Sequence, residues 1–183
     1  MRDSETGRTG DAGKDAHRGP AGPHVPRSPL ESAWRPASTL RSVVPADFEA
    51  LYRLDQICFE PGIAYSREEL ARFLGIHTAE GIVAEEDGRI VGFVIGYLAA
   101  RRVGHVVTLD VHPERRRQGI GKALIEKLLE RFSRTGSRAA RLEVSTENST
   151  AIRFYESLGF FRRRRIPDYY GPGRDALEMI RHL

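Results

Sequence analysis

Cysteine is almost absent from this chain of 183 residues, and no long apolar run occurs in it. Its one cysteine, Cys58, has no partner for a disulfide within the chain, and none of its six histidines has the spacing of zinc ligands. The longest apolar stretch, residues 90–100, contains two glycines and is shorter than the ~18–20 residues that cross a bilayer. The first residues lack the apolar core of a secretory signal. These absences argue against a disulfide scaffold, a zinc protein and a membrane protein, so we expect a cytoplasmic protein without a metal.

The chain does have the composition of an ordinary globular protein, with 40% hydrophobic and 30% charged residues. Its length suits one domain with a tail. A net charge of +4 is compatible with binding a nucleic acid, an anionic cofactor or an acidic partner. Charge alone therefore does not choose among these ligands.

Proline and glycine are concentrated in the N-terminal segment. Residues 1–37 hold five of the chain's ten prolines and five glycines, with Trp34 as their only aromatic residue. Such a segment cannot bury enough apolar surface to offset the entropy lost on ordering. We therefore predict a disordered extension over residues 1–37 and a folded domain over residues 38–183.

From Leu40 onward, strand-like and helix-like patterns follow one another. Asp87-Gly88 forms the turn of a hairpin between two β-branched runs, and Ser66 with Glu69 forms a capping box at the start of a short helix. The predicted elements are a strand at 40–44, helices at 46–59 and after Ser66, strands at 82–84, 90–97 and 105–111, a helix through Phe132, a strand at 139–144, a helix at 148–158, and strands at 160–166 and 176–180. This order, β-α-α-β-β-β-α-β-α-β-β, indicates an α/β (α+β) domain built around a mixed sheet.

The segment after Val111 has the form of a diphosphate site. A strand that ends at Pro113 is followed by three arginines, by Gly119-Ile120-Gly121 and then by a helix. Glycines at a helix start let the backbone approach a ligand, and the exposed N–H groups with the helix dipole favour an anion. Arginine adds charge that matches phosphate.

Two common phosphate-binding motifs fit this loop less well. A mononucleotide P-loop needs glycine where Arg116 stands and serine or threonine where Ala123 stands. A dinucleotide fingerprint fits the two glycines, and Glu143 lies near the spacing expected for a ribose contact. However, its third small position is Leu124, and the glycines follow the strand only after several residues.

The loop resembles instead the Q/R-x-x-G-x-G/A signature of the GNAT superfamily of N-acetyltransferases, here Arg116-x-x-Gly119-x-Gly121. A second block at family spacing agrees with it, namely Leu142-Glu143-Val144, Asn148 and the run from Ala151 to Phe160. The resemblance extends from about Leu40 to the C-terminus and is closest to ribosomal-protein-alanine and protein N-terminal acetyltransferases. It implies a mostly antiparallel central sheet flanked by helices, and acetyl-CoA as co-substrate.

The resemblance also implies how acetyl-CoA is bound. The pyrophosphate of coenzyme A is expected over the loop made by Arg116, Arg117, Gln118, Gly119, Ile120, Gly121 and Lys122. The strand before the loop is expected to diverge from its neighbour, so that backbone groups of Leu109 and Val111 bind the pantetheine arm. The Val111 N–H is then the expected oxyanion donor, a role worth roughly 3 kcal/mol. Asn148 is expected to cap its helix and to contact the coenzyme.

Two residues are assigned to proton transfer. Glu143 occupies the position of a glutamate proposed as general base in the ribosomal-alanine enzymes, and an acceptor amine with a pKa of about 8 or above must lose a proton before it attacks. Tyr155 lies in the family at the position beside the coenzyme sulfur, where a phenol suits a general acid. His105 and His112 match no motif and are assigned no role.

The acceptor is expected to lie between two loops, 59–65 and 166–171. Phe59, Tyr169 and Tyr170 are the predicted contacts, and paired tyrosines resemble a feature of protein N-terminal acetyltransferases. The first loop lacks the Phe-Pro-Trp-like element of the bacterial ribosomal enzymes. We expect a protein or peptide N-terminus as the acceptor, including that of a ribosomal protein, with a lysine side chain or a small amine as the alternative.

Four consecutive arginines, Arg162 to Arg165, permit a non-enzymatic alternative. They could form a nucleic-acid-binding patch. The run has no interleaved aromatic residues for base stacking, and a charged edge strand explains it as well. We therefore expect no nucleic acid as the main partner.

Overall fold

The computed structural model describes residues 38–99 and 102–183. Its elements, in chain order, are β1 (Thr39–Ser42), α1 (Phe48–Cys58), α2 (Arg67–Leu74), β2 (Ala79–Glu86), β3 (Arg89–Ala99), β4 (Val103–Val111), α3 (Ile120–Arg134), β5 (Ala139–Ser145), α4 (Ser149–Ser157), β6 (Phe161–Ile166) and β7 (Ala176–His182). This is the predicted order of strands and helices. The extension predicted for residues 1–37 lies outside the described residues.

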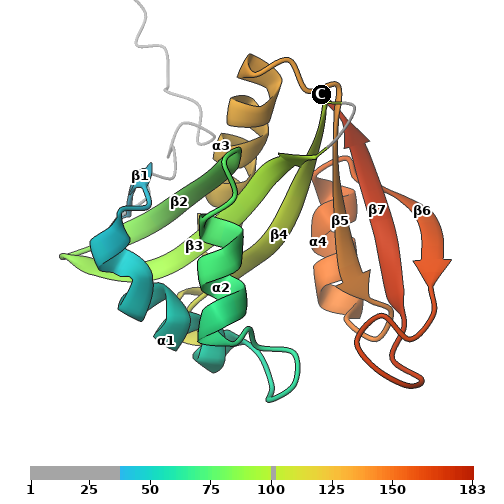
Figure 1. The fold of residues 1–183 in the computed structure, drawn as a ribbon, viewed down its shortest axis with the longest axis horizontal. Helices are drawn as coiled ribbons and strands as arrows, with labels where there is room; N and C mark the ends of the chain where they lie inside the picture. The colour runs from blue at the N-terminus through green and yellow to red at the C-terminus, as the bar shows by residue number, and fades with distance from the viewer. Residues whose placement is uncertain (1–37, 100–101) are drawn as a thin grey trace, which may run out of the picture. The chain divides into compact units, whose positions relative to one another are not determined.

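A seven-stranded sheet organises the domain, with strand order β1-β2-β3-β4-β5-β7-β6. Every neighbouring pair is antiparallel except β4 and β5, which run parallel. The predicted mixed, mostly antiparallel sheet is thus confirmed. Figure 1 shows β6 and β7 together at one side of the sheet and β1 at the other.

Helices cover both faces of the sheet. α1 and α2 pack on β2, β3 and β4, while α3 packs on the opposite face of β2 to β5. α4 shares the core of α3, because Ile152 and Leu158 are buried in the same cluster as Leu128 and Phe132. On the α1 and α2 face, these helices lie mainly over β2, β3 and β4. Figure 1 shows them away from β7 and β6.

Local sequence explains the helix starts and the close packing of α3. Ser66 accepts a hydrogen bond from the Glu69 N–H, and the Glu69 carboxylate accepts one from the Ser66 N–H, which confirms the predicted capping box. On the sheet, a Cβ added at Gly104 would lie 2.1 Å from the Phe132 ring. Glycine at this position therefore allows α3 to approach the sheet. Among the helices of residues 38–99 and 102–183, none is both long and apolar enough to cross a membrane.

Two carboxyl groups are buried beneath α1. Asp55 on α1 and Asp110 on β4 are 0% and 1% exposed, and each keeps one oxygen without a hydrogen-bond partner in the described part of the chain. Burial raises the pKa of Asp55 to about 6, although hydrogen bonds from the Tyr65 N–H and the Gln56 side chain lower it in part. Burial also raises the pKa of Asp110.

Replacing Asp55 with asparagine should therefore change how stability depends on pH. An aspartate has a pKa of about 3.9 when unfolded, so the native state binds more protons between pH 4 and 6. The contribution of Asp55 is present below pH 4 and is lost as pH rises through 6. Relative to the parent, Asp55→Asn should gain about 2 kcal/mol of unfolding free energy between pH 4.5 and pH 8, measured by urea denaturation.

A control variant with the opposite pKa shift is available. The Arg41 side chain lowers the pKa of Asp47, so the contribution of Asp47 is present above its unfolded pKa of about 3.9 and is lost only at lower pH. The stability difference between Asp47→Asn and the parent should therefore stay nearly constant from about pH 4.5 to pH 8 and shrink below about pH 4. A constant difference between Asp55→Asn and the parent from about pH 4.5 to pH 8 would contradict the assignment of Asp55 as a buried acid.

Candidate active site

β4 and β5 pair over only three residues each. The ladder joins Val103, Gly104 and His105 to Ala139, Ala140 and Arg141. Beyond it β4 continues to Val111 and β5 to Ser145, and the two strands diverge in Figure 1. β5 remains paired with β7 along its whole length. The divergence therefore leaves one edge of β4 open, and we call the space between the two strands the wedge.

Backbone groups of β4 point into the wedge. The His112 N–H donates to the Val91 carbonyl at 2.9 Å, and because alternate residues of a strand point their backbone groups to opposite edges, Val111 points away from β3. The Val111 carbonyl accepts from Arg116 Nε at 3.0 Å and from Cys58 Sγ at 3.4 Å. By the same alternation Leu109 faces the wedge. The two residues predicted to bind the pantetheine arm thus lie on its open edge.

The loop after β4 has the backbone of an anion site. Arg117 and Gly119 both have positive φ, 63° and 80°, and Gly119 is the N-cap of α3 with no side chain capping the helix. The first N–H groups of α3 are therefore available to an external acceptor. Turns that combine left- and right-handed residues direct successive N–H groups toward one point, as in phosphate-binding loops. Positive φ at a bulky residue such as Arg117 costs free energy, which is typical of binding sites.

Several side chains of the loop already bond to other groups of the protein. Arg115 Nε lies 2.9 Å from Glu86 Oε2, and Arg116 Nε donates to the Val111 carbonyl. Gln118 Nε2 donates back to the Glu114 carbonyl at 3.2 Å. Ile120 is buried, and a Cβ at Gly121 would meet neighbours at ordinary contact distance. Lys122 is exposed. The loop thus offers its backbone and the side chains of Arg117 and Lys122 to a ligand.

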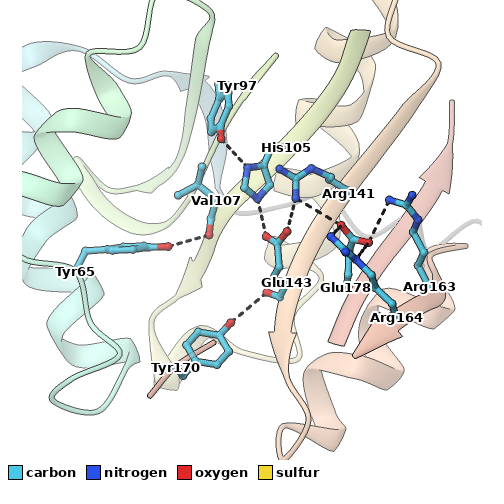
Figure 2. A network of polar contacts seen from close by, with 10 residues as sticks. All are labelled: Tyr65, Tyr97, His105, Val107, Arg141, Glu143, Arg163, Arg164, Tyr170 and Glu178. Carbon is cyan, nitrogen blue, oxygen red and sulfur yellow. Dashed lines mark hydrogen bonds and ion pairs between the residues drawn. The ribbon is translucent and has the colours of Figure 1, made fainter. Parts of the chain in front are cut away.

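Glu143 lies on β5 beside the wedge, and its side chain is 7% exposed. His105 Nε2 lies 2.6 Å from Glu143 Oε2 and donates to it, because a carboxylate only accepts. His105 Nδ1 lies 2.9 Å from the Tyr97 hydroxyl oxygen. The Arg141 guanidinium contacts the other oxygen of Glu143. Figure 2 shows these groups as one chain that runs across β3, β4 and β5.

The sequence did not predict the contact between His105 and Glu143, and it assigned His105 no role. His105 is separated from Glu143 by 38 residues, and no motif joins the two. The parallel register that pairs His105 with Arg141 places Glu143 two residues farther along the same face. Knowledge of that register would have found it. His112, the other histidine without an assigned role, follows β4, and its backbone N–H donates to the Val91 carbonyl.

The environment of Glu143 favours its charged form. Burial acts to raise the pKa of its carboxyl, but the hydrogen bond and charge of His105, with the charges of Arg141 and Arg164, lower the pKa below its ordinary value. Glu143 is therefore a carboxylate throughout the neutral range and a weaker base than an isolated glutamate.

Tyr155 lies on α4 and is packed edge-to-face between Phe154 and Phe160, with ring centroids 5.2 and 5.7 Å away. Burial raises the pKa of its phenol, with smaller contributions from Asp110 and Tyr170. Its hydroxyl makes no hydrogen bond within the described part of the chain, so it remains free to donate. Asn148 caps α4 as predicted, with its side-chain oxygen accepting from the Ala151 N–H at 2.9 Å.

Tyrosines from two separate loops gather near Glu143. The Tyr170 hydroxyl donates to the Glu143 carbonyl at 3.3 Å, and the Tyr169 and Tyr170 rings are 4.9 Å apart. The Tyr65 hydroxyl donates to the Val107 carbonyl in the wedge at 3.3 Å (Figure 2). Burial raises the pKa of Tyr65, with smaller contributions from Tyr169 and Tyr170. Tyr65 belongs to the predicted acceptor loop 59–65, but the residue named there as a contact was Phe59, the partly buried residue that follows α1.

Comparison with known proteins finds N-acetyltransferases. The sequence profile of the acetyltransferase (GNAT) family matches residues 48–160. An uncharacterized N-acetyltransferase of Methanocaldococcus jannaschii is 33% identical over 144 residues, or 78% of this chain and 90% of that protein. An N-alpha-acetyltransferase of Sulfurisphaera tokodaii is 33% identical over 119 residues, or 58% of this chain and 71% of that protein. The crystal structure of the ribosomal-protein-S18-alanine N-acetyltransferase from Escherichia coli has a TM-score of 0.73 and 27% identity, and the match covers 79% of this chain and 93% of that one.

Proposed function

We propose that this chain, which belongs to the acetyltransferase (GNAT) family, transfers the acetyl group of acetyl-CoA to the α-amino group of a protein or peptide N-terminus. That it is an acyltransferase follows from the family. What we propose is the identity of the acceptor. The observation that supports it most is the placement of Tyr65 and Tyr170, because their hydroxyls come from separate loops and contact the Val107 and Glu143 carbonyls of the two strands that border the wedge (Figure 2).

Acetyl-CoA has a site whose parts fit its chemistry. The pyrophosphate would lie on the N–H groups of residues 118–122, where two left-handed residues and the uncapped start of α3 favour an anion. The pantetheine arm would enter the wedge and pair with Leu109 and Val111. In this arrangement the Val111 N–H faces the thioester carbonyl and would stabilise the oxyanion. Asn148 would contact the arm in addition to capping α4.

Glu143 would take the first proton. The α-amino group has a pKa of about 8, so most of it is ammonium at neutral pH and cannot attack. Glu143 accepts a proton from it directly or through one water, and the neutral amine then attacks the thioester. Because the pKa of Glu143 is lowered, the proton does not remain there. The proton passes on to water, because His105 Nε2 already donates a hydrogen to Glu143 and cannot accept a second one.

Tyr155 would supply the proton that the departing sulfur needs. A thiol has an ordinary pKa of about 8.5, and burial raises the pKa of Tyr155, so a lasting transfer from the phenol would be unfavourable. A relay avoids this cost. Tyr155 donates to sulfur as it receives the proton leaving the new amide nitrogen. The products are the acetylated amine, coenzyme A thiol and one released proton, so the step balances.

Support for an N-terminal acceptor also comes from the relatives. The names of the S. tokodaii protein and of the E. coli enzyme refer to α-amino and ribosomal-protein alanine acetylation, and we propose a protein of this kind, such as a ribosomal protein, as the partner. A lysine side chain or a small amine is the second candidate, since the same groups would acetylate either.

A panel of acceptors tests the proposal. The enzyme with acetyl-CoA is given peptides with a free N-terminus, the same peptides with a blocked N-terminus and one lysine, and small diamines, and coenzyme A release is followed. We expect the highest kcat/KM with free N-termini. Turnover of the small amines without turnover of any peptide would overturn the acceptor assignment.

Gly119→Ala should weaken acetyl-CoA binding about tenfold or more, because alanine disfavours the φ of +80° on which the loop depends. Isothermal titration calorimetry measures the effect. Gly88→Ala is the matched control: Gly88 has a φ of +74° in the hairpin turn and open space around its Cβ position. Alanine at either position strains the folded backbone to a similar extent. Equal coenzyme affinity in the two variants would show that the loop does not bind the coenzyme.

A further inference from the structure

A line of alternating charges extends from Glu143 to the outer edge of the sheet. Glu178 on β7 lies directly opposite Glu143 on β5, and Arg164 on β6 lies directly opposite Glu178. Two carboxylates facing each other across strands repel. Arg141 relieves this repulsion, because its guanidinium contacts Glu143 and lies 3.7 Å from Glu178. Figure 2 shows this line, with Arg163 and Arg164 at its outer end.

Among the described residues, Glu178 is the one acidic partner of Arg163 and Arg164. Its side chain is 2% exposed, and Arg163 Nη1 and Arg164 Nε lie 3.2 and 3.0 Å from Oε2. Together with Arg141, three guanidinium groups share this one carboxylate. At the inner end, the positive charge of Arg141 balances the negative charge of Glu143. At the outer end, Arg163 and Arg164 carry two positive charges against the single negative charge of Glu178. The excess positive charge therefore lies at the outer end, where the side chains of Arg163 and Arg164 are 55% and 64% exposed.

The other two arginines of β6 are differently placed. Arg162 is paired with Glu156 of α4 at 2.8 Å, and Arg165 is paired with Asp175. Each has its own carboxylate, and neither contacts Glu178. The uncompensated charge thus belongs to Arg163 and Arg164 alone, on the face of the sheet that carries Glu143.

The distance from Glu143 to this charge suits an extended peptide. β5 and β6 are separated by β7, and neighbouring strands lie about 4.8 Å apart, so the two positions are about 10 Å apart. An extended chain advances about 3.3 Å per residue. A peptide whose amine lies at Glu143 and which crosses toward β6 would bring the side chains of its second to fourth residues to Arg163 and Arg164. α1 and α2 pack on β2, β3 and β4, and Figure 1 shows them away from β7 and β6.

We propose that Arg163 and Arg164 form an acceptor subsite that binds an acidic side chain in the second to fourth residue of the substrate. The proposal rests on the proposed function, because it assumes a peptide acceptor at Glu143. Guanidinium groups bind carboxylates through paired N–H donors, and an incoming carboxylate would neutralise the excess charge. A peptide fits better than a nucleic acid, which would need a longer run of unpaired cations along its phosphates.

The experiment compares peptides that differ in one charge. Each peptide has the same free N-terminal residue and carries glutamate or glutamine at one of positions two, three and four. We expect the KM of the best glutamate peptide to be about fivefold below that of its glutamine partner at low salt. The difference should shrink toward one at 0.5 M NaCl, because salt screens exposed charges. This measurement uses the parent enzyme and needs no variant to fold.

Variants locate the subsite. Arg163→Gln combined with Arg164→Gln should bring the KM ratio of glutamine to glutamate peptide close to one, and Arg162→Gln, the control from the same strand, should keep the parent ratio. Equal KM values for both peptides in the parent, or loss of the preference in Arg162→Gln alone, would overturn the subsite. So would retention on an RNA oligonucleotide without any preference for acidic peptides. If no peptide is acetylated, it is the proposed function that fails.

Discussion

Tyr155→Phe should lower kcat about 100- to 10,000-fold, the range in which a positioned proton donor contributes to catalysis. The phenol is packed by Phe154 and Phe160, and phenylalanine keeps that packing. Because the hydroxyl makes no hydrogen bond within residues 38–99 and 102–183, its removal leaves no buried group unpaired. The dissociation constant of acetyl-CoA should therefore stay close to that of the parent, and the loss should appear in kcat.

Steady-state kinetics with calorimetry on coenzyme A separates the two effects. Tyr52→Phe is the control, because it removes a phenol from α1, where the Tyr52 ring contacts Arg67. A solvent isotope effect should be present in the parent and altered in Tyr155→Phe. Full turnover by Tyr155→Phe would remove Tyr155 from proton transfer, whatever its position.

Glu143→Gln should produce the second large loss, and the loss should depend on pH. At pH 6.5 the α-amino group is almost entirely ammonium, given its pKa of about 8, so a variant without the base should be slower by about 100-fold or more. At pH 9.5 the amine is already neutral, and the variant should approach the parent. Its kcat/KM should rise about tenfold per pH unit below pH 8, with a shallower rise in the parent.

The pH–rate profiles of both proteins, measured with one peptide, check this prediction. Glu147→Gln is the control, since Glu147 is an exposed glutamate between β5 and α4 and its loss should leave the profile unchanged. Parallel profiles for Glu143→Gln and the parent would show that Glu143 takes no proton from the substrate. A role in holding His105 and Arg141 alone would lower the rate equally at all pH values.

Much of the fold follows from local features of the sequence. The Asp87-Gly88 turn, the capping box at Ser66 and the helical spacing after Gly121 each depend on neighbouring residues, and all appear in the structure. Element ends were less well predicted. α1 begins at Phe48, two residues later than predicted, because Pro45–Asp47 form a 3-10 turn before it.

The candidate site was only partly predictable. The glycine loop and the positions of Glu143 and Tyr155 could be assigned because they belong to short motifs. His105, Tyr97, Arg141 and Glu178 belong to none. Their contacts depend on strand register, which joins residues of β3, β4, β5 and β7 that are distant in the chain. A shift of one residue in any of these ladders would turn the side chains to the other face, so composition and spacing alone could not find them.

One measurement tests the central claim, that the wedge delivers acetyl groups to an α-amine. A single peptide with a free N-terminus, an acidic third residue and one internal lysine is incubated with the enzyme and acetyl-CoA, and the acetyl group is located by tandem mass spectrometry. We predict acetylation of the α-amino group, with the lysine unmodified. Acetyl on the lysine with a free N-terminus would contradict the account.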